Sequence, residues 1–385
     1  MGEQIMRRYV IAPDSFKGTM SSIEICDLIE GIILELDPGA KVDKVPVADG
    51  GEGLVDAFLS MSGGKGRRIE TRVTGPLFAP VDSFFGMLDD GDTAIVEMAA
   101  AAGLPMLTKE QRNPEKTTSV GVGELLLQAV EAGAKKIVIG LGGSATNDGG
   151  IGMAHALGYR FLDSAGTELS PVGGSLAKIA RIVPPSEKAI PDSIVIEAAC
   201  DVNNLMYGKK GAAYIFGPQK GADPEMVEAL DQGLMNLADR LEQDLGINVR
   251  HIPGGGAAGG LGAGVVAFLG GTLRPGIELL LDAVHFDELV SQADYVFTGE
   301  GRMDGQSLSG KTPVGVAMRA KRFNVPVIGV VGSLGKEVEP LYEVGFTTVV
   351  STIRDLASLD ETLRNARIDL ITMVRTLVRL IVAKK

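Results

Sequence analysis

Short apolar runs that each end in a polar, glycine-containing turn constrain the fold of this chain most. The clearest are RRYVIAPDSFKG (7–18), KVPVADGGEG (44–53) and DYVFTGEGRMD (294–304). A stretch with helical spacing of its apolar residues follows each turn. This order of strand, turn and helix predicts βαβ units and therefore an α/β fold around a parallel sheet.

The middle of the chain has a different pattern. Residues 67–99 contain three extended runs separated by turn signals such as Gly-Pro and Asp-Asp-Gly, which predicts an antiparallel sheet. Strand-like runs return at 135–143 and 193–201, and a long helix is expected over 223–246, with an Asp-Pro cap at its start and Gly246 at its end. The run PGGGAAGGLGAG (253–264) is too rich in glycine to predict a regular element.

The two ends of the chain thus resemble each other, while the middle is mixed. The length of 385 residues is sufficient for two domains. We therefore predict a discontinuous parallel-sheet domain from residues 1–65 and 290–385, with a mixed α/β domain inserted at 66–289. The last helix of the first domain carries an apolar stripe that predicts a core face. Its members are Leu363, Ala366, Leu370, Met373, Leu377 and Leu380.

Composition limits the possible partners and location. The net charge of −12 disfavours a nucleic acid, although a few basic residues in a cleft can still bind a small anion. Cys26 and Cys200 are the only cysteines and lack metal-like spacing, which indicates a reducing compartment. No secretory signal and no apolar run of membrane-spanning length is recognised, so a cytoplasmic protein is expected. The oligomeric state is left open.

The segment GQSLSGKT (305–312) satisfies the G-x-x-x-x-G-K-[ST] pattern of phosphate loops. In such loops the strand runs directly into the first glycine, whereas here GEGRMD separates the strand candidate from Gly305. We therefore interpret the match as coincidental. Lys311 is kept as a candidate phosphate contact.

The segment GLGGSA (140–145) satisfies the pattern of dinucleotide-binding loops, and Asp163 lies about twenty residues further on, where a ribose-binding carboxylate would be. This favours an NAD-dependent oxidoreductase as one alternative. The loop continues with polar groups, however, whereas a dinucleotide loop needs small residues there. These groups suggest a ligand with several oxygens, with or without a metal ion, or a polar turn that caps the next helix. They are Ser144, Thr146, Asn147 and Asp148.

Polar residues also follow the carboxyl ends of the predicted strands, where open α/β sheets bind ligands. Singly, each such group is more often part of a turn. Together they predict a cleft lined by carboxylates and basic groups. Arg302 would either bind a small carboxylate or bridge its acidic neighbours. The candidates are Ser15, Lys17, Asp49, Glu300, Arg302, Asp304, Asp201 and Lys220.

Taken together, these segments resemble the two-domain bacterial glycerate kinases of the type that forms 2-phosphoglycerate. The stretches that carry the resemblance run in order from residue 10 to beyond 330. They are VIAPDSFKG, PVADGGEG, VEMAAAAGL, KTTSVGVGELL, IGLGGSATNDGG, AACDV, FGPQKGA, PGGGAAGGLGAG and TGEGRMDGQSLSGK. The resemblance implies a discontinuous flavodoxin-like domain plus an inserted mixed α/β domain, with the active site in the cleft between them.

The resemblance also implies ATP-dependent, Mg²⁺-assisted phosphorylation of D-glycerate, with 2-phosphoglycerate favoured over 3-phosphoglycerate. On this hypothesis Asp201 or, as second choice, Asp49 accepts the proton of the hydroxyl, and Lys17 stabilises the transferring group. Substrate binding is assigned to Ser15, Glu300, Arg302 and Asp304. Nucleotide binding is assigned to Gly142, Gly143, Ser144, Thr146, Asn147, Lys220 and Lys311, and Asp148 is the metal ligand. The rivals are the oxidoreductase and a sensing module that binds glycerate or a nucleotide without turnover.

Overall fold

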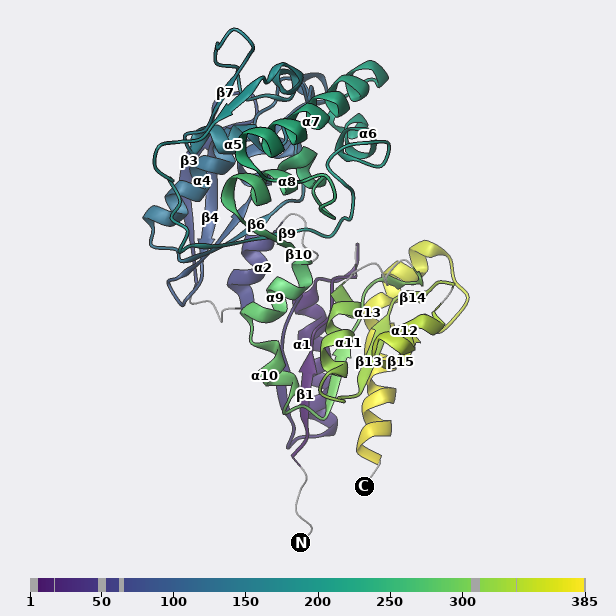
Figure 1. Cartoon of the computed structure of the whole chain (residues 1–385). Coiled ribbons are helices and arrows are strands. Elements are labelled where there is room, and N and C mark those ends of the chain that lie inside the picture. The colour runs from purple at the N-terminus through teal and green to yellow at the C-terminus, as the bar shows by residue number, and fades with distance from the viewer. Residues whose placement is uncertain are drawn as a thin grey trace. The chain divides into compact units, whose positions relative to one another are not determined.

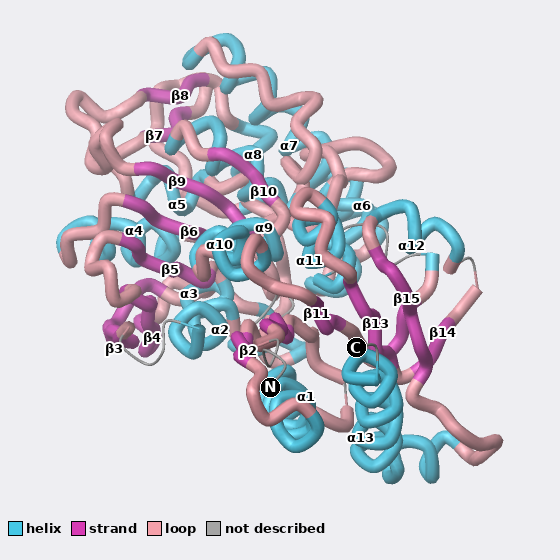
Figure 2. The backbone as a smooth tube through the Cα atoms, turned by 90° about the horizontal axis from the view of Figure 1, so that it is seen from below, coloured by secondary structure: helices cyan, strands magenta, loops and turns pink. Residues whose placement is uncertain are grey.

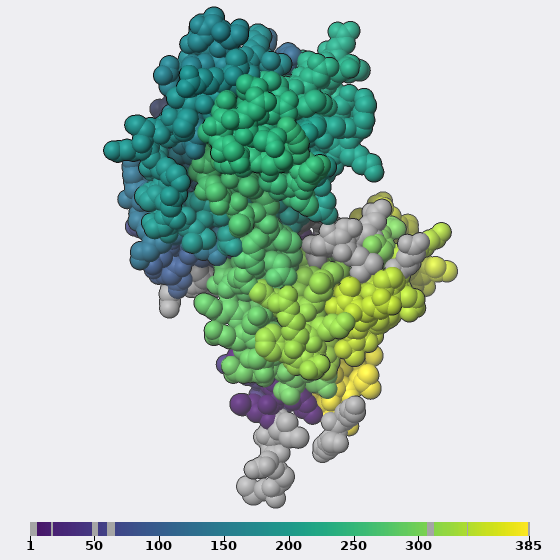
Figure 3. Space-filling model, viewed as in Figure 1, coloured from purple at the N-terminus to yellow at the C-terminus, as the bar shows by residue number. Residues whose placement is uncertain are grey.

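The computed structural model describes residues 6–16, 18–47, 53–61, 66–305, 312–336 and 338–383. The chain divides into two compact units. The terminal unit comprises Met1–Asp49 and Ile277–Lys385, and the middle unit comprises Gly50–Gly276. The purple N-terminal and the yellow C-terminal residues gather in one body in the space-filling view (Figure 3), although the middle unit separates them in the sequence.

The terminal unit contains a five-stranded sheet with the order β15-β13-β11-β1-β2, in which every pair of neighbours is parallel. Numbered by their appearance in this unit, the strands follow the order 2-1-3-4-5 of flavodoxin-like folds. The predicted fold class is confirmed. The strands are β1 (Arg8–Ile11), β2 (Lys41–Lys44), β11 (Tyr295–Thr298), β13 (Val327–Val331) and β15 (Phe346–Ser351). The short strands β12 (Arg302–Met303) and β14 (Ser333–Leu334) form a separate pair.

Helices cover both faces of this sheet (Figure 2). One face carries α1 (Ser22–Leu36) and α13 (Leu359–Ala383). Helix α1 begins in a capping box, since the Ser21 hydroxyl accepts from the Glu24 N–H and the Glu24 carboxylate accepts from the Ser21 N–H. The other face carries α9 (Gly276–Ala283), α10 (Phe286–Val290), α11 (Thr312–Lys321) and α12 (Glu339–Val344).

Helix α13 packs the middle of the predicted stripe on the core: Leu370 is fully buried, and Ala366, Met373 and Leu377 are partly buried against the same cluster. Leu363 and Leu380 are 44% and 72% exposed. The two ends of the predicted stripe are exposed because tertiary contacts, which periodicity does not reveal, decide how far the buried face extends. The residues that the structure buries are Leu370, Val374, Val378 and Ile381, with Asp369 beside them. In the described part of the chain, no helix combines the length and apolar character of a membrane span.

The middle unit is built on a six-stranded mixed sheet with the order β10-β9-β6-β5-β4-β3 (Figure 1). The predicted antiparallel arrangement over 67–99 is confirmed for β3, β4 and β5, and the remaining pairs are parallel. The strands are β3 (Arg67–Thr74), β4 (Pro80–Met87), β5 (Thr93–Glu97), β6 (Lys136–Gly140), β9 (Val195–Ala199) and β10 (Thr272–Arg274). A small hairpin-like pair, β7 (Arg160–Leu162) with β8 (Arg181–Val183), stands apart.

The helices of the middle unit surround one large apolar core. The longest, α7 (Pro224–Leu245), has the predicted Asp223 cap, whose carboxylate accepts from the Met226 N–H, and ends at Gly246 in the left-handed conformation. The others are α2 (Leu54–Met61), α3 (Ala99–Ala102), α4 (Val120–Glu131), α5 (Ile151–Ala156), α6 (Ala212–Phe216) and α8 (Ala257–Leu269).

The divisions between the units, at 49/50 and 276/277, differ from the predicted ones at 65/66 and 289/290. Helix α2 belongs to the middle unit because Glu97, at the end of β5, accepts a hydrogen bond from the Val55 N–H at 2.8 Å. Helices α9 and α10 belong to the terminal unit, where the buried Arg319 of α11 pairs with Asp282 and Glu278. Short sequence patterns do not encode these tertiary contacts.

The glycine-rich run 253–264 is more regular than predicted, because α8 begins within it. Ala258, Gly259 and Gly260 have φ values of 52°, 69° and 94°, and regular helix follows from Leu261. A Cβ atom on Gly259 would lie 2.1 Å from the carbonyl oxygen of Thr146. Glycine is therefore required here by the close approach of α8 to the 146–149 loop.

Candidate functional site

Two buried carboxylates follow neighbouring strands of the terminal sheet. Asp14 comes after β1 and Glu300 after β11, and they are 6% and 7% exposed. The Asp14 N–H donates to the Gly299 carbonyl oxygen at 2.9 Å, which fixes the loop after β1 against the end of β11. The strand order reverses between β1 and β11, and doubly wound sheets bind their ligands at such a switch point.

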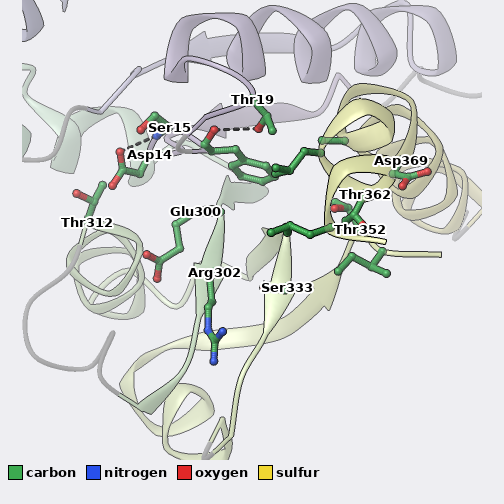
Figure 4. Close-up of a pocket in the computed structure, with 17 residues that line it drawn as sticks. Asp14, Ser15, Thr19, Glu300, Arg302, Thr312, Ser333, Thr352, Thr362 and Asp369 are labelled. Carbon is green, nitrogen blue, oxygen red and sulfur yellow. Dashed lines mark hydrogen bonds between the residues drawn. The ribbon is translucent and has the colours of Figure 1, made fainter. Parts of the chain in front are cut away.

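A cavity of about 480 Å³ lies at this edge of the terminal sheet (Figure 4). Its lining comes from the segments that follow β1, β11, β13 and β15 and from the first turns of α13. Asp14, Ser15, Glu300 and Thr312 lie toward one end of the close-up, and Thr352, Thr362 and Asp369 lie toward the other. We call this cavity the terminal-unit pocket. It is large enough for a ligand of drug or nucleotide size.

The pocket brings together three residues that the sequence predicted for substrate binding, namely Ser15, Glu300 and Arg302. The Arg302 side chain is 71% exposed, and its Nε lies 3.4 Å from Asp304 Oδ2, so it both reaches solvent and contacts an acidic neighbour. Asp304 supports Arg302 without lining the pocket.

Sequence reasoning did not single out Asp14, although it follows β1 as directly as Glu300 follows β11. The rule that ligands lie beyond the carboxyl ends of strands would have selected it. The threonines and leucines of the other end gave no comparable signal. Lys17, Asp49 and Lys311 lie outside the described residues, as does most of GQSLSGKT, and their roles stay predictions.

The polar loop after β6 in the middle unit is mostly buried. Thr146 and Asn147 are fully buried, and the Lys220 ammonium, 2% exposed, donates to Ser144 Oγ and to the Thr146 carbonyl oxygen, each at 2.7 Å. The nucleotide contacts predicted for Thr146, Asn147 and Lys220 therefore fall on buried side chains and stay predictions. Gly142 and Gly143 are the more accessible part of the loop.

Asp148, the predicted metal ligand, is fully buried and hydrogen-bonded to the segments around it. Its carboxylate accepts hydrogen bonds from Ser119 N and Oγ, both at 2.8 Å, from the Gly150 N–H at 3.1 Å and from the Gly152 N–H at 3.3 Å. The bonds from Gly150 and Gly152 hold the start of α5, as expected if the polar turn caps the next helix. Burial raises the pKa of the Asp148 carboxyl. Within the described ranges, no three metal-ligating side chains of the His, Cys, Asp or Glu type cluster together.

Asp201 is accessible and well positioned. It follows β9 at the carboxyl edge of the middle sheet, and its Oδ1 accepts a hydrogen bond from the Gly276 N–H at 2.9 Å. That bond orients one carboxylate oxygen and joins the segments after β9 and β10. The position suits a group that handles a proton of a bound ligand.

The comparisons with known proteins agree over nearly the whole chain. The model of the "Glycerate kinase family" matches residues 9–382. The chain belongs to the glycerate kinase family. It is 46% identical to a glycerate kinase of Bacillus subtilis over 359 residues, covering 93% of this chain and 94% of that protein. It is also 46% identical to a glycerate 2-kinase of Escherichia coli over 360 residues, covering 93% and 94%.

A solved structure supports the same relationship. A protein of Salmonella typhimurium LT2, provisionally described as glycerate kinase 2, superimposes with a TM-score of 0.86 at 44% identity and covers 98% of this chain and 99% of its own. The similarity therefore extends to the arrangement of the backbone as well as to the motifs.

Family membership and geometry both overturn the oxidoreductase alternative. In a dinucleotide site the glycine-rich turn leads directly into a helix. Here β6 ends at Gly140 and α5 begins at Ile151, with a buried polar loop between them. Asp163 does not follow a strand of the main sheet; its Oδ1 accepts from the N–H groups of Ala165 and Thr167 in a surface turn.

The buried Lys220 makes stability depend on pH. Burial lowers the pKa of Lys220 to about 7 from its ordinary value of 10.5. Between pH 7 and pH 10.5, Lys220 is protonated in the unfolded chain but mostly deprotonated in the folded chain. The free energy of unfolding therefore increases as the pH rises through this range. We expect the stability of the wild type, relative to Lys220→Met, to increase from pH 7 to pH 10 in urea unfolding.

The exposed Lys210 provides a matched control, because Lys210→Met changes the same side chain on the surface of the same unit. The difference in free energy of unfolding between Lys210→Met and the wild type should be the same at every pH in this range. A Lys220→Met curve that runs parallel to the wild-type curve would contradict the lowered pKa.

Proposed function

We propose that this chain transfers the γ-phosphoryl group of ATP to the 2-hydroxyl of D-glycerate. The observation that carries the proposal is the relationship to glycerate kinases over nearly the whole chain. The name of the Escherichia coli relative, glycerate 2-kinase, supports the choice of hydroxyl. The proposed products are ADP and 2-phosphoglycerate.

Phosphoryl transfer depends mainly on positioning and on stabilisation of negative charge. Mg²⁺ commonly uses one or two protein carboxylates and completes its coordination with phosphate oxygens and water. Asp14 and Glu300, both buried at the switch point and both part of the pocket lining, fit this mode and would hold the ion. Bound Mg²⁺ would neutralise charge on the phosphates. Asp148, with its oxygens already bonded within the middle unit, is not part of this proposal.

Asp201 is our candidate for the group that orients the acceptor hydroxyl and takes its proton. Its exposed position and its hydrogen bond from Gly276 support this role. Arg302 would bind the carboxylate of glycerate, because its exposed guanidinium lines the pocket. Lys17 as a charge stabiliser, Asp49 as an alternative base and Lys311 as a phosphate contact remain proposals from the sequence.

We also propose that the protein acts in the cytoplasm on small molecules and without a nucleic-acid partner. The net charge of −12 supports the second point, because the phosphate backbone of DNA or RNA would be repelled. Two free cysteines, Cys26 and Cys200, are compatible with a reducing compartment.

The reaction itself can be tested by phosphorus NMR of the products after incubation with Mg-ATP and D-glycerate. We expect a 2-phosphoglycerate signal to grow as ADP appears. A 3-phosphoglycerate signal would keep the kinase activity and refute the proposed hydroxyl. Intact ATP in the presence of folded protein would refute the proposed reaction.

The proposed metal carboxylates can be tested with Asp14→Asn and Glu300→Gln. Each amide removes one negative charge while keeping the shape of the side chain, so we expect the Mg²⁺ concentration for half-maximal activity to rise about 10-fold or more. Initial rates over a Mg²⁺ titration provide the measurement. Asp360→Asn, an exposed acid of the same unit, is the control. An unchanged Mg²⁺ requirement in both variants would exclude these carboxylates as the metal ligands.

The role of Asp201 can be tested with Asp201→Asn. The amide oxygen can still accept the hydrogen bond from the Gly276 N–H, so the local structure should be retained. Loss of the proton acceptor should lower kcat by about 10²–10⁴-fold. The affinity for ADP, measured by calorimetry, should stay the same. A kcat within about threefold of the wild type would assign the proton to another group.

A further inference from the structure

One end of the terminal-unit pocket has no use in binding a three-carbon acid. Apolar side chains line it, although glycerate offers almost no apolar surface to bury. The cavity of about 480 Å³ also exceeds the space that so small a molecule fills. The apolar residues of this end are Ile353, Leu359, Leu363 and Ala366, and Phe16, which follows Ser15, also lines the pocket.

Three of these side chains are unusually open for apolar groups that lie so close together. Leu359, Leu363 and Ile353 are 72%, 44% and 42% exposed. They are neighbours of Thr352 and Thr362, which Figure 4 places at the end of the pocket away from Asp14 and Glu300. A single exposed leucine needs no explanation, but aliphatic groups gathered in one pocket indicate a surface that a ligand covers.

Acidic residues next to this end disfavour phosphate groups as that ligand, and the cation nearby, Arg354, is already paired with Asp369. Asp360 and Glu361 occupy the first turn of α13. Ser358 and Glu361 form a capping box, with the Ser358 hydroxyl accepting from the Glu361 N–H at 3.3 Å and the Glu361 carboxylate accepting from the Ser358 N–H at 3.2 Å. The helix terminus is therefore already matched with negative charge and would repel an anion.

We propose that the apolar end of the pocket binds the base of the nucleoside triphosphate, and that the phosphates extend toward Asp14 and Glu300. This inference rests on the proposed kinase function and specifies where its nucleotide lies. A nucleotide matches both ends, because its base is flat and largely apolar and its phosphates need a bound cation. In this pose the phosphates would lie at the switch point of the sheet, where such folds bind ligands.

Polar groups at the same end match the edge of a purine. The Thr362 hydroxyl donates to the Ser358 carbonyl oxygen at 3.0 Å, so toward a ligand its oxygen acts as an acceptor. The Asp369 carboxylate, which accepts from Arg354 Nε at 2.7 Å, also offers only acceptors when ionised. Acceptors of this kind suit the exocyclic amino group of a purine base.

The test is the affinity for Mg-ADP, measured by calorimetry without glycerate, in the double variant Leu359→Asn/Leu363→Asn. Asparagine is close to leucine in size but loses the apolar contact. We expect ADP to bind about tenfold more weakly or worse, with the KM for glycerate within about twofold of the wild type. The control is Leu356→Asn/Leu380→Asn, since these leucines are 101% and 72% exposed and lie outside the pocket lining.

ADP affinity that is unchanged, or lowered equally in the control, would overturn the assignment. A raised KM for glycerate with normal ADP binding would also overturn it, because this end of the pocket would then bind glycerate. The two proposals can fail separately. If the leucine variant binds ADP more weakly but the wild type forms no phosphoglycerate, only the proposed reaction is refuted. If the wild type forms phosphoglycerate but the leucine variant binds ADP normally, only the proposed base site is refuted.

Discussion

The parallel pairing of β1 with β11 is the interaction on which the terminal unit depends. It joins the first strand of the chain to a strand that follows the middle unit, with Tyr9 opposite Tyr295 and Ile11 opposite Phe297. Hydrogen bonds continue past the strands, since the Thr298 hydroxyl donates to the Ala12 carbonyl oxygen at 2.7 Å. The backbone that leads to Asp14 is thus held by the strand that leads to Glu300. Closing so long a loop costs entropy, but the cost grows only slowly with loop length. The middle unit, which forms this loop, also has its own core and is ordered independently of the β1–β11 pairing.

The polar, glycine-rich loop of the middle unit and the candidate ligand groups of the terminal unit are built in different ways. In the middle unit, glycines allow α8 to approach the 146–149 loop, and Lys220 and Asp148 satisfy polar backbone that would otherwise be buried without partners. A polar loop with conspicuous hydrogen-bonding side chains can therefore be a rigid internal support. The terminal unit reaches its candidate ligand groups through single carboxylates at strand ends, a sparser pattern that is easier to overlook.

The sequence was sufficient to predict the α/β class, the antiparallel segment over 67–99 and the ends of α7. Each of these depends on local signals, such as the alternation of apolar runs or the Asp-Pro and Gly246 boundaries. The ends of the units and the buried face of α13 depend on which surfaces meet in three dimensions. For the same reason a pattern could not separate Asp148 as a helix cap from Asp148 as a metal ligand, because both interpretations require an acidic residue after a glycine-rich turn.

The terminal-unit pocket combines two kinds of support. Its carboxylates follow strands whose backbone is fixed by parallel hydrogen bonding on both sides, so their position can be held as closely as phosphoryl transfer requires. Its leucines belong to the first turns of α13, beyond the stretch from Leu370 to Ile381 that anchors the helix in the core. Contacts made there tolerate small shifts, because apolar burial has no strict direction. If the proposed roles hold, the sheet fixes the carboxylates that the chemistry needs, and the less constrained end of a helix supplies the apolar contact area for binding.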